Sequence, residues 1–148
     1  MFGGNMNVLI TEDEAILAGE LEAFVKDLGH EVVGIASSSH KALKLAESSS
    51  CDLALVDVNL SDGATGTALA RHLSEKSSTT VIFTTSNPHS IPDDFSSACG
   101  VLIKPYSEKC IKSAIEFVAD CMTSGESQRR KPRALQLSPT YAARWNVC

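Results

Sequence analysis

A carboxylate at the end of an apolar run is the first sign of chemistry in this sequence. Asp57 directly follows the run Leu53–Val56, which is typical of a buried strand. An unpaired carboxylate inside such a strand would cost several kcal/mol, so a position at the strand end, facing a crevice, indicates a reactive group. Glu12 and Asp13 stand just after a second strand candidate, Asn7–Ile10. The sequence therefore offers three carboxylates that two strand ends could bring together.

These carboxylates suggest phosphoryl chemistry that depends on a metal ion. Asp13 and Asp57 would repel each other by about a few kcal/mol at close range, and a hard divalent cation such as Mg²⁺ would relieve that repulsion. A carboxylate beside such an ion can attack a phosphoryl group and form an aspartyl phosphate. Lys104 follows the apolar run Gly100–Ile103 and would balance the added negative charge. The hydroxyl of Thr85, at the end of another apolar run, could hydrogen-bond a phosphoryl oxygen.

An alternation of strands and helices must position these residues. Helical spacing of apolar residues separates the strand candidates, and Gly29 and the serines at 37–39 supply a helix stop and a helix start. Parallel strands need crossover connections, so the pattern predicts a doubly wound α/β fold with five parallel strands and helices on both faces. Functional groups gather where the carboxyl ends of such strands meet. The predicted strands are Asn7–Ile10, Glu31–Ala36, Asp52–Val58, Thr80–Thr85 and Gly100–Pro105.

The connection between the last two strands is the least regular part of the prediction. Pro88 and Pro92 interrupt residues 86–98, so we expect only a short or late-starting helix there. The last helix, in contrast, carries a strong apolar stripe and should pack firmly against the sheet. The stripe consists of Ile111, Ile115, Val118 and Met122.

Length and charge limit the classes of protein to which the chain could belong. Its 148 residues are enough for one domain with one core. Residues 1–123 hold 8 basic and 17 acidic side chains, a net charge of −9, which argues against a nucleic-acid surface. The N-terminus lacks the features of an export signal and the apolar runs are short, so we expect a cytoplasmic protein that does not enter a membrane.

The C-terminal residues 124–148 differ in composition from the rest of the chain. They hold 5 basic and 1 acidic side chains, a net charge of +4, with two prolines and no helical periodicity. We therefore predict a domain at residues 1–123 and a basic, disordered tail at residues 124–148. Docking of the tail on the acidic domain or on a partner is the alternative.

Four short motifs, in this order and at this spacing, resemble the receiver domains of two-component response regulators. They are the acidic pair in VLITEDE, the lone aspartate in LALVDVNLSDG, the hydroxyl in VIFTTS and the lysine in GVLIKPY. Each motif alone is weak, but together they extend the resemblance over roughly residues 6–123. The stretches DVNLSDGATG and GVLIKPYS look most like the single-domain and general-stress receivers of alphaproteobacteria.

The resemblance implies a flavodoxin-like (βα)5 fold with strand order 2-1-3-4-5 and a Mg²⁺-dependent phosphorylation of Asp57. It also implies that the protein catalyses only its own phosphorylation and dephosphorylation and is otherwise not an enzyme. The donor would be a sensor histidine kinase, of the HWE or HisKA_2 type, or a phosphotransfer protein. The implied roles are Asp57 as phosphoacceptor, Asp13 as a direct Mg²⁺ ligand, Glu12 as a ligand through water, the Asn59 backbone carbonyl as a third ligand, Thr85 as the switch hydroxyl and Lys104 as the phosphate-contacting lysine.

The sequence departs from the family pattern at the position that usually carries the signal onward. Receivers usually have Phe or Tyr three residues before the lysine, and here that residue is Val101. The sequence therefore predicts phosphorylation more firmly than its readout. Because no second domain for DNA binding is evident in the sequence, we expect output through contacts with a protein partner or action as a phosphate sink. A homodimer stays open.

Three other classes share part of this pattern. A phosphatase of the haloacid-dehalogenase type also uses an Asp nucleophile and Mg²⁺, but its motif is D-x-D, whereas Asn59 stands at the second position here. A flavodoxin-like cofactor binder needs a first loop that holds phosphate, and the acidic stretch TEDEA would repel it. A pseudo-receiver that serves only as an interaction module is disfavoured because the acidic set and the lysine are complete.

Overall fold

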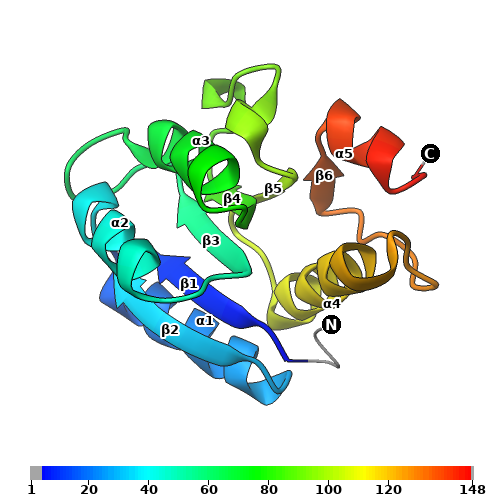
Figure 1. Ribbon diagram of the computed structural model, residues 1–148, viewed down its shortest axis with the longest axis horizontal. Helices are drawn as coiled ribbons and strands as arrows, with labels where there is room; N and C mark the ends of the chain where they lie inside the picture. The colour runs from blue at the N-terminus through cyan, green and yellow to red at the C-terminus, as the bar shows by residue number, and fades with distance from the viewer. Residues whose placement is uncertain (1–4, 148) are drawn as a thin grey trace.

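A computed structural model describes residues 5–147, so expectations for the first four residues and for Cys148 lie outside it. The strands form one sheet in the order β2-β1-β3-β4-β5-β6 (Figure 1). The first five strands are parallel, which confirms the doubly wound α/β fold and the order 2-1-3-4-5. The elements are β1 (Asn7–Thr11), α1 (Ala15–Asp27), β2 (Glu31–Ala36), α2 (Ser39–Ser48), β3 (Leu53–Asp57), α3 (Gly66–Lys76), β4 (Thr80–Thr85), η1 (Pro88–Ser90), η2 (Phe95–Ser97), β5 (Gly100–Ile103), α4 (Glu108–Ser124), β6 (Leu135–Leu137) and α5 (Pro139–Arg144).

Local signals in the sequence set the ends of the first two helices. Gly29, just beyond α1, has a φ of +90°, a left-handed conformation that glycine adopts without steric cost. Ser38 caps α2, because its side-chain oxygen accepts a hydrogen bond from the backbone N–H of Lys41 at 3.2 Å. Both features match the sequence predictions.

Alternate residues of the central strands supply two hydrophobic cores, one on each face of the sheet. On one face, Val8 and Ile10 share a core with buried residues of α1 and α4. On the other face, Leu9 shares a core with buried residues of α2 and α3. The predicted stripe of α4 lies in the first core, with Ile111, Ile115 and Val118 fully buried. Helices on both faces thus hold β1, β3, β4 and β5 in fixed register.

Residues 86–99, all of which the structure describes, form no α-helix. The two 3₁₀ turns η1 and η2 take the place of the short or late-starting helix, so that prediction is wrong, although the expected irregularity is present. Three successive residues, Phe95 to Ser97, have positive φ values, a conformation that costs roughly 1–2 kcal/mol per non-glycine residue. The turn is held on α3 by an ion pair between Arg71 Nη2 and Asp94 Oδ2 at 2.9 Å.

The C-terminal residues are ordered, so the prediction of a disordered tail at residues 124–148 is wrong for the part that the structure describes. The strand β6 pairs antiparallel with β5 at the edge of the sheet, and α5 follows it (Figure 1). Leu135 and Trp145 are buried in the same core as α4. Sequence periodicity missed this arrangement because two isolated apolar residues, ten positions apart, make no repeating pattern. The predicted domain and tail therefore share one sheet.

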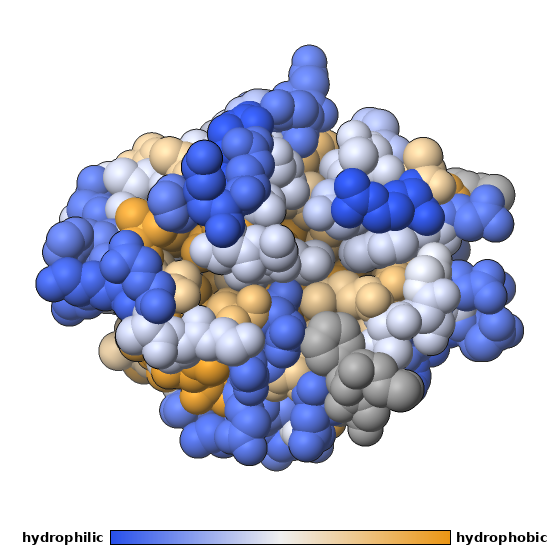
Figure 2. All heavy atoms as spheres, viewed as in Figure 1, coloured by the Kyte–Doolittle hydropathy of each residue, from blue (hydrophilic) through white to orange (hydrophobic). Residues whose placement is uncertain are grey.

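The surface carries little extended hydrophobic area. Figure 2 shows a largely hydrophilic face on which hydrophobic residues form small separate patches. Among the described residues, the large hydrophobic side chains that lie exposed are Ile16 and Ile35. No helix within residues 5–147 is long and apolar enough to cross a membrane.

Two glycine substitutions test how tightly the fold closes around Asp57. A Cβ at Gly66 would collide with the backbone oxygen of Asp57 and lie 2.6 Å from Cα of Val58. We expect Gly66→Ala to lower the free energy of unfolding by about 1–3 kcal/mol. The matched control is Gly19→Ala in α1, where an added Cβ meets no described atom within 4 Å; it should raise the free energy of unfolding by about 0.5–1 kcal/mol. Urea denaturation measures both, and equal stability of the two variants would contradict the packing.

Candidate functional site

Four neighbouring parallel strands deliver the predicted site residues to one edge of the sheet. Glu12 and Asp13 directly follow β1, and Asp57 is the last residue of β3. Thr85 is the last residue of β4, and Lys104 directly follows β5. Because the carboxyl ends of parallel strands lie at the same edge, these side chains converge in the crevice above β1, β3 and β5.

Lys104 lies at the centre of the site and pairs with two carboxylates. Its Nζ is 2.8 Å from Oδ2 of Asp57 and 3.0 Å from Oε1 of Glu12. The Glu12 side chain is fully buried, and the Asp57 side chain is 8% exposed. Two carboxylates at this depth require a cation, since removal of one partner from a buried ion pair typically costs about 3–5 kcal/mol. Lys104 supplies this cation for both carboxylates.

The environment changes the proton affinity of these groups. Burial raises the pKa of Glu12 to about 7, although the hydrogen bond from Lys104 opposes the rise. Burial alone would lower the pKa of Lys104, but its hydrogen bonds to Asp57 and Glu12 outweigh that effect and raise the pKa above its ordinary value. Lys104 therefore stays protonated and remains the resident cation of the site.

Glu12, Asp13 and Asp57 form an acidic cluster that fits a small divalent cation. One carboxylate oxygen from each residue lies within 4.8 Å of the others, and Asp13 is exposed to solvent. An all-oxygen donor set with an open side is what Mg²⁺ requires, since it retains waters and accepts phosphate oxygens. The cluster brings together the three carboxylates predicted from the sequence, and its donor chemistry fits the implied ion.

Backbone contacts orient the Asp57 carboxylate. Its Oδ1 accepts a hydrogen bond from the backbone N–H of Asn59 at 3.1 Å, while Oδ2 faces Lys104. The N-terminus of α3 approaches from behind, where the backbone N–H of Gly66 donates to the Val58 carbonyl at 2.9 Å. The loop that carries Asn59 is therefore fixed against β3, and one carboxylate edge stays turned toward the crevice.

The Thr85 hydroxyl is buried and bonded to its own loop rather than to a carboxylate. Its Oγ1 accepts a hydrogen bond from the backbone N–H of Asn87 at 3.0 Å and donates to the Asn87 carbonyl at 3.3 Å. The two predicted partners of Asp57 therefore differ in their contacts. Lys104 already contacts Asp57, whereas the Thr85 hydroxyl is hydrogen-bonded to the backbone of Asn87. Any bond from Thr85 to a group on Asp57 would require the start of the 86–98 segment to rearrange.

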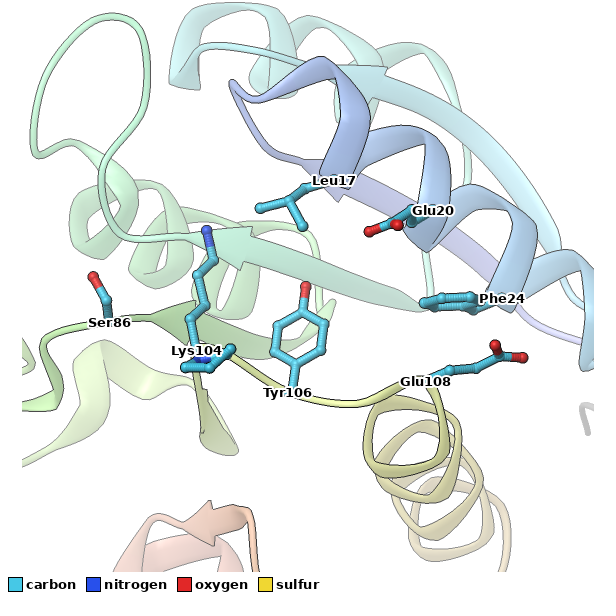
Figure 3. Close-up of a pocket in the computed structure, with 8 residues that line it drawn as sticks. Leu17, Glu20, Phe24, Ser86, Lys104, Tyr106 and Glu108 are labelled. Carbon is cyan, nitrogen blue, oxygen red and sulfur yellow. The ribbon is translucent and has the colours of Figure 1, made fainter.

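A cavity of about 570 Å³ opens beside the site, between α1 and the loop that joins β5 to α4. Figure 3 shows Lys104 and Tyr106 rising into it, with Leu17, Glu20 and Phe24 on the α1 side. The Tyr106 hydroxyl is buried and has no hydrogen-bond partner among the described residues. Burial raises its pKa to about 12. Sequence reasoning gave Tyr106 no role, although its place two residues after Lys104 marks it as a neighbour of the site.

The sequence of this chain is similar to those of known proteins. The family model of the response regulator receiver domain matches residues 8–116. The phyllosphere-induced regulator PhyR of Methylorubrum extorquens is 42% identical over 82 residues, which are 55% of this chain and 31% of PhyR. The transcriptional regulatory protein PdtaR of Mycobacterium tuberculosis is 30% identical over 112 residues, 74% of this chain and 55% of PdtaR.

A solved structure agrees with the sequence relatives. The receiver domain of PhyR from Erythrobacter litoralis superposes with a TM-score of 0.68 at 29% identity, covering 76% of this chain and 88% of that domain. This chain spans 31% and 55% of the lengths of the two curated relatives, so the shared part is the receiver region. The matched residues 8–116 contain the whole acidic cluster and Lys104, and the chain belongs to the response regulator receiver domain family.

Proposed function

We propose that this protein is a response regulator receiver in which Asp57 accepts a phosphoryl group from a histidine kinase or a phosphotransfer protein. The observation that supports this most strongly is the Asp57 carboxylate at the end of β3, 2.8 Å from Lys104 and grouped with Glu12 and Asp13. A carboxylate in a crevice, beside a cation, is a competent nucleophile toward phosphorus.

The reaction is a transfer between two protein side chains. A carboxylate oxygen of Asp57 attacks the phosphorus of a phosphohistidine on the donor. An oxygen–phosphorus bond forms as the phosphorus–nitrogen bond breaks, and the electron pair leaves on the imidazole nitrogen, which takes up a proton from solvent. In this proposal the protein catalyses only its own phosphorylation and the later hydrolysis, because Asn59 provides no acid for turnover of an external substrate.

The acidic cluster would hold Mg²⁺ during this reaction. We assign Asp13 and Asp57 as direct ligands, Glu12 as a ligand through water, and the backbone carbonyl of Asn59 as the third protein ligand. The bound ion would offset the repulsion between these carboxylates and the entering phosphoryl oxygens. Lys104 would contact the phosphoryl group from the opposite side, since its ammonium already lies 2.8 Å from Asp57.

The readout would pass through Thr85 to the segment 86–98. Phosphorylation adds a charge of about −1.5 to −2 and three strong acceptor oxygens. To donate to one of them, the Thr85 hydroxyl must give up its bond to the carbonyl of Asn87. The segment has no α-helix to resist this change, and Val101 beside it carries no aromatic ring. We therefore propose a signal that consists mainly of a rearrangement of residues 86–98 and is read by a protein partner.

The proposed type of donor rests on sequence resemblance rather than on the geometry. The stretches DVNLSDGATG and GVLIKPYS resemble receivers that a sensor kinase of the HWE or HisKA_2 type phosphorylates, and we propose a donor of that type. Neither the acidic cluster nor the cavity beside it distinguishes a kinase from a phosphotransfer protein.

The first prediction is that Asp57 is the single phosphoacceptor. Incubation with acetyl phosphate and Mg²⁺ should add one phosphoryl group by intact mass, stable in acid and labile in base. Asp57→Asn should abolish the addition, because the amide is a poor nucleophile. The matched control Asp93→Asn alters an exposed carboxylate outside the cluster and should leave the yield unchanged. An undiminished yield in Asp57→Asn would falsify the assignment, and a parent protein that takes up no phosphoryl group would favour the pseudo-receiver alternative.

The second prediction is that Asp13 is required for Mg²⁺ binding. Isothermal titration of Mg²⁺ should show one weak saturable site, and Asp13→Ala should weaken it roughly 10- to 100-fold, as for other changes at metal sites. Asp93→Ala serves as the control for loss of one surface charge. If Asp13→Ala binds Mg²⁺ as well as the parent protein does, the metal site lies elsewhere.

The third prediction concerns Val101, which is buried next to a cavity of about 300 Å³ lined by Ile91, Phe95 and Gln136. Hydrogen exchange with and without beryllofluoride should change in residues 86–98 and at the start of α4, with little change in α1 and α2. Val101→Tyr places a ring in the cavity, so it should alter partner affinity more than the rate of phosphorylation. Unchanged exchange in residues 86–98, or loss of phosphorylation with intact partner binding in Val101→Tyr, would contradict this readout.

A further inference from the structure

The outer edge of β5 is covered by a segment of the same chain. β6 pairs with all but the last residue of β5, in the register Gly100 with Leu137, Val101 with Gln136 and Leu102 with Leu135. The backbone N–H of Ser138 adds a hydrogen bond to the Cys99 carbonyl at 2.8 Å. Open strand edges bind other strands, so a segment that covers one controls access to it. We refer to residues 135–147, which comprise β6, α5 and Trp145, as the C-terminal cap.

The three atoms that a Cβ at Gly100 would approach most closely all belong to this cap. A Cβ at Gly100 would lie 2.6 Å from the backbone oxygen of Gln136 and 3.2 Å from Cδ1 of Leu135. The third nearest atom, the backbone carbon of Gln136 at 3.4 Å, also belongs to the cap. The absence of a side chain at Gly100 therefore serves the close approach of β6 to β5.

The cap is held by a short strand and a few buried residues. Leu135 and Trp145 are buried, 0% and 5% exposed. β6 has only three residues, and grooves of about 340, 300 and 250 Å³, partly open to solvent, each have cap residues in their walls. A short edge strand bordered by solvent opens at lower free energy than the central strands of a sheet.

The segment 86–98 forms the opposite wall of two of these grooves. In the first, Asp94 and Ser97 face Tyr141 and Arg144 of α5. In the second, Ile91 and Phe95 face Gln136 and Pro139, and Val101 also lines the space. A displacement of this segment would therefore change the shape of both grooves that border the cap.

The strand order gives the direction of the dependence. In the sequence of strands β3-β4-β5-β6, Asp57 lies on the β3 side of Thr85 and the cap lies on the other side. A shift of Thr85 and the following residues toward a phosphoryl group on Asp57 is a shift away from the cap. It would widen the two grooves and move one of their walls away from α5.

We propose that the C-terminal cap is a built-in occupant of the β5 edge that is released when Asp57 is phosphorylated. This inference rests on the proposed function and specifies its output: an open strand edge, together with the apolar residues of the cap, becomes available to an extended segment of a partner protein.

Trp145 is the single tryptophan of the chain and reports directly on the cap. Acetyl phosphate or beryllofluoride with Mg²⁺ should shift its fluorescence emission to longer wavelength and increase quenching by acrylamide. Hydrogen exchange in residues 135–147 should accelerate in the same samples. Asp57→Asn should show neither change. Phosphorylated protein, verified by intact mass, with unchanged emission and exchange would overturn the inference alone. A parent protein that takes up no phosphoryl group would overturn the proposed function and with it the coupling.

Two variants test the cap without phosphorylation. Gly100→Ala should expose Trp145 in the resting protein and, because coupling is reciprocal, increase the phosphorylated fraction at a given acetyl phosphate concentration severalfold. Leu135→Ser weakens the cap from its own side, outside the core strands, and should act in the same direction. Gly19→Ala is the matched glycine control and should change neither measurement. Exposure of Trp145 in both cap variants with an unchanged or lower phosphorylated fraction would refute release by phosphorylation.

Discussion

The structure depends on one constraint: two carboxylates lie buried at neighbouring strand ends, and Lys104 must neutralise them. Glu12 and Asp57 each contact the same ammonium, at 3.0 and 2.8 Å, from the ends of the neighbouring strands β1 and β3. Without this cation the repulsion between them at an effective dielectric of 20 would be about 3–4 kcal/mol at a separation of 4–5 Å. The same cation contacts Asp57, and Asp13 completes an acidic cluster on the solvent side.

The rest of the fold fixes the strands that carry Glu12 and Asp57 and leaves the part of the sheet beyond β4 free to move. β1 and β3 are clamped between two cores, and Gly66 lets α3 pack directly against the backbone of Asp57. On the far side of β4, the connection to β5 is a strained turn tied to α3 by Arg71, and beyond it the C-terminal cap borders open space. A rigid site next to a short edge strand is compatible with the phosphorylation switch that we propose.

The fold class and the convergence of the site could be predicted because both follow from repeated local patterns, whereas the strand order came from the resemblance to receiver domains. Alternating strands and helices allow few topologies. A carboxylate that follows an apolar strand, such as Asp57, indicates a reactive group at the strand end. Residues 86–98 were less predictable, since Pro88 and Pro92 rule out a regular helix without specifying what replaces it. The cap was missed because its order comes from long-range packing, with Leu135 and Trp145 in the core that α4 lines and β6 close beside Gly100, rather than from any periodicity. The roles assigned to the site residues stay predictions.

The most direct test of the central claim is to locate the phosphoryl group chemically in the unaltered protein. Borohydride reduces an aspartyl phosphate to homoserine, and tandem mass spectrometry of the digested protein identifies the reduced residue. After reaction with acetyl phosphate and Mg²⁺, the account predicts homoserine at position 57 and unmodified residues at Glu12 and Asp13. Reduction at Glu12 or Asp13, or a phosphorylated protein with no reduced residue at position 57, would contradict it.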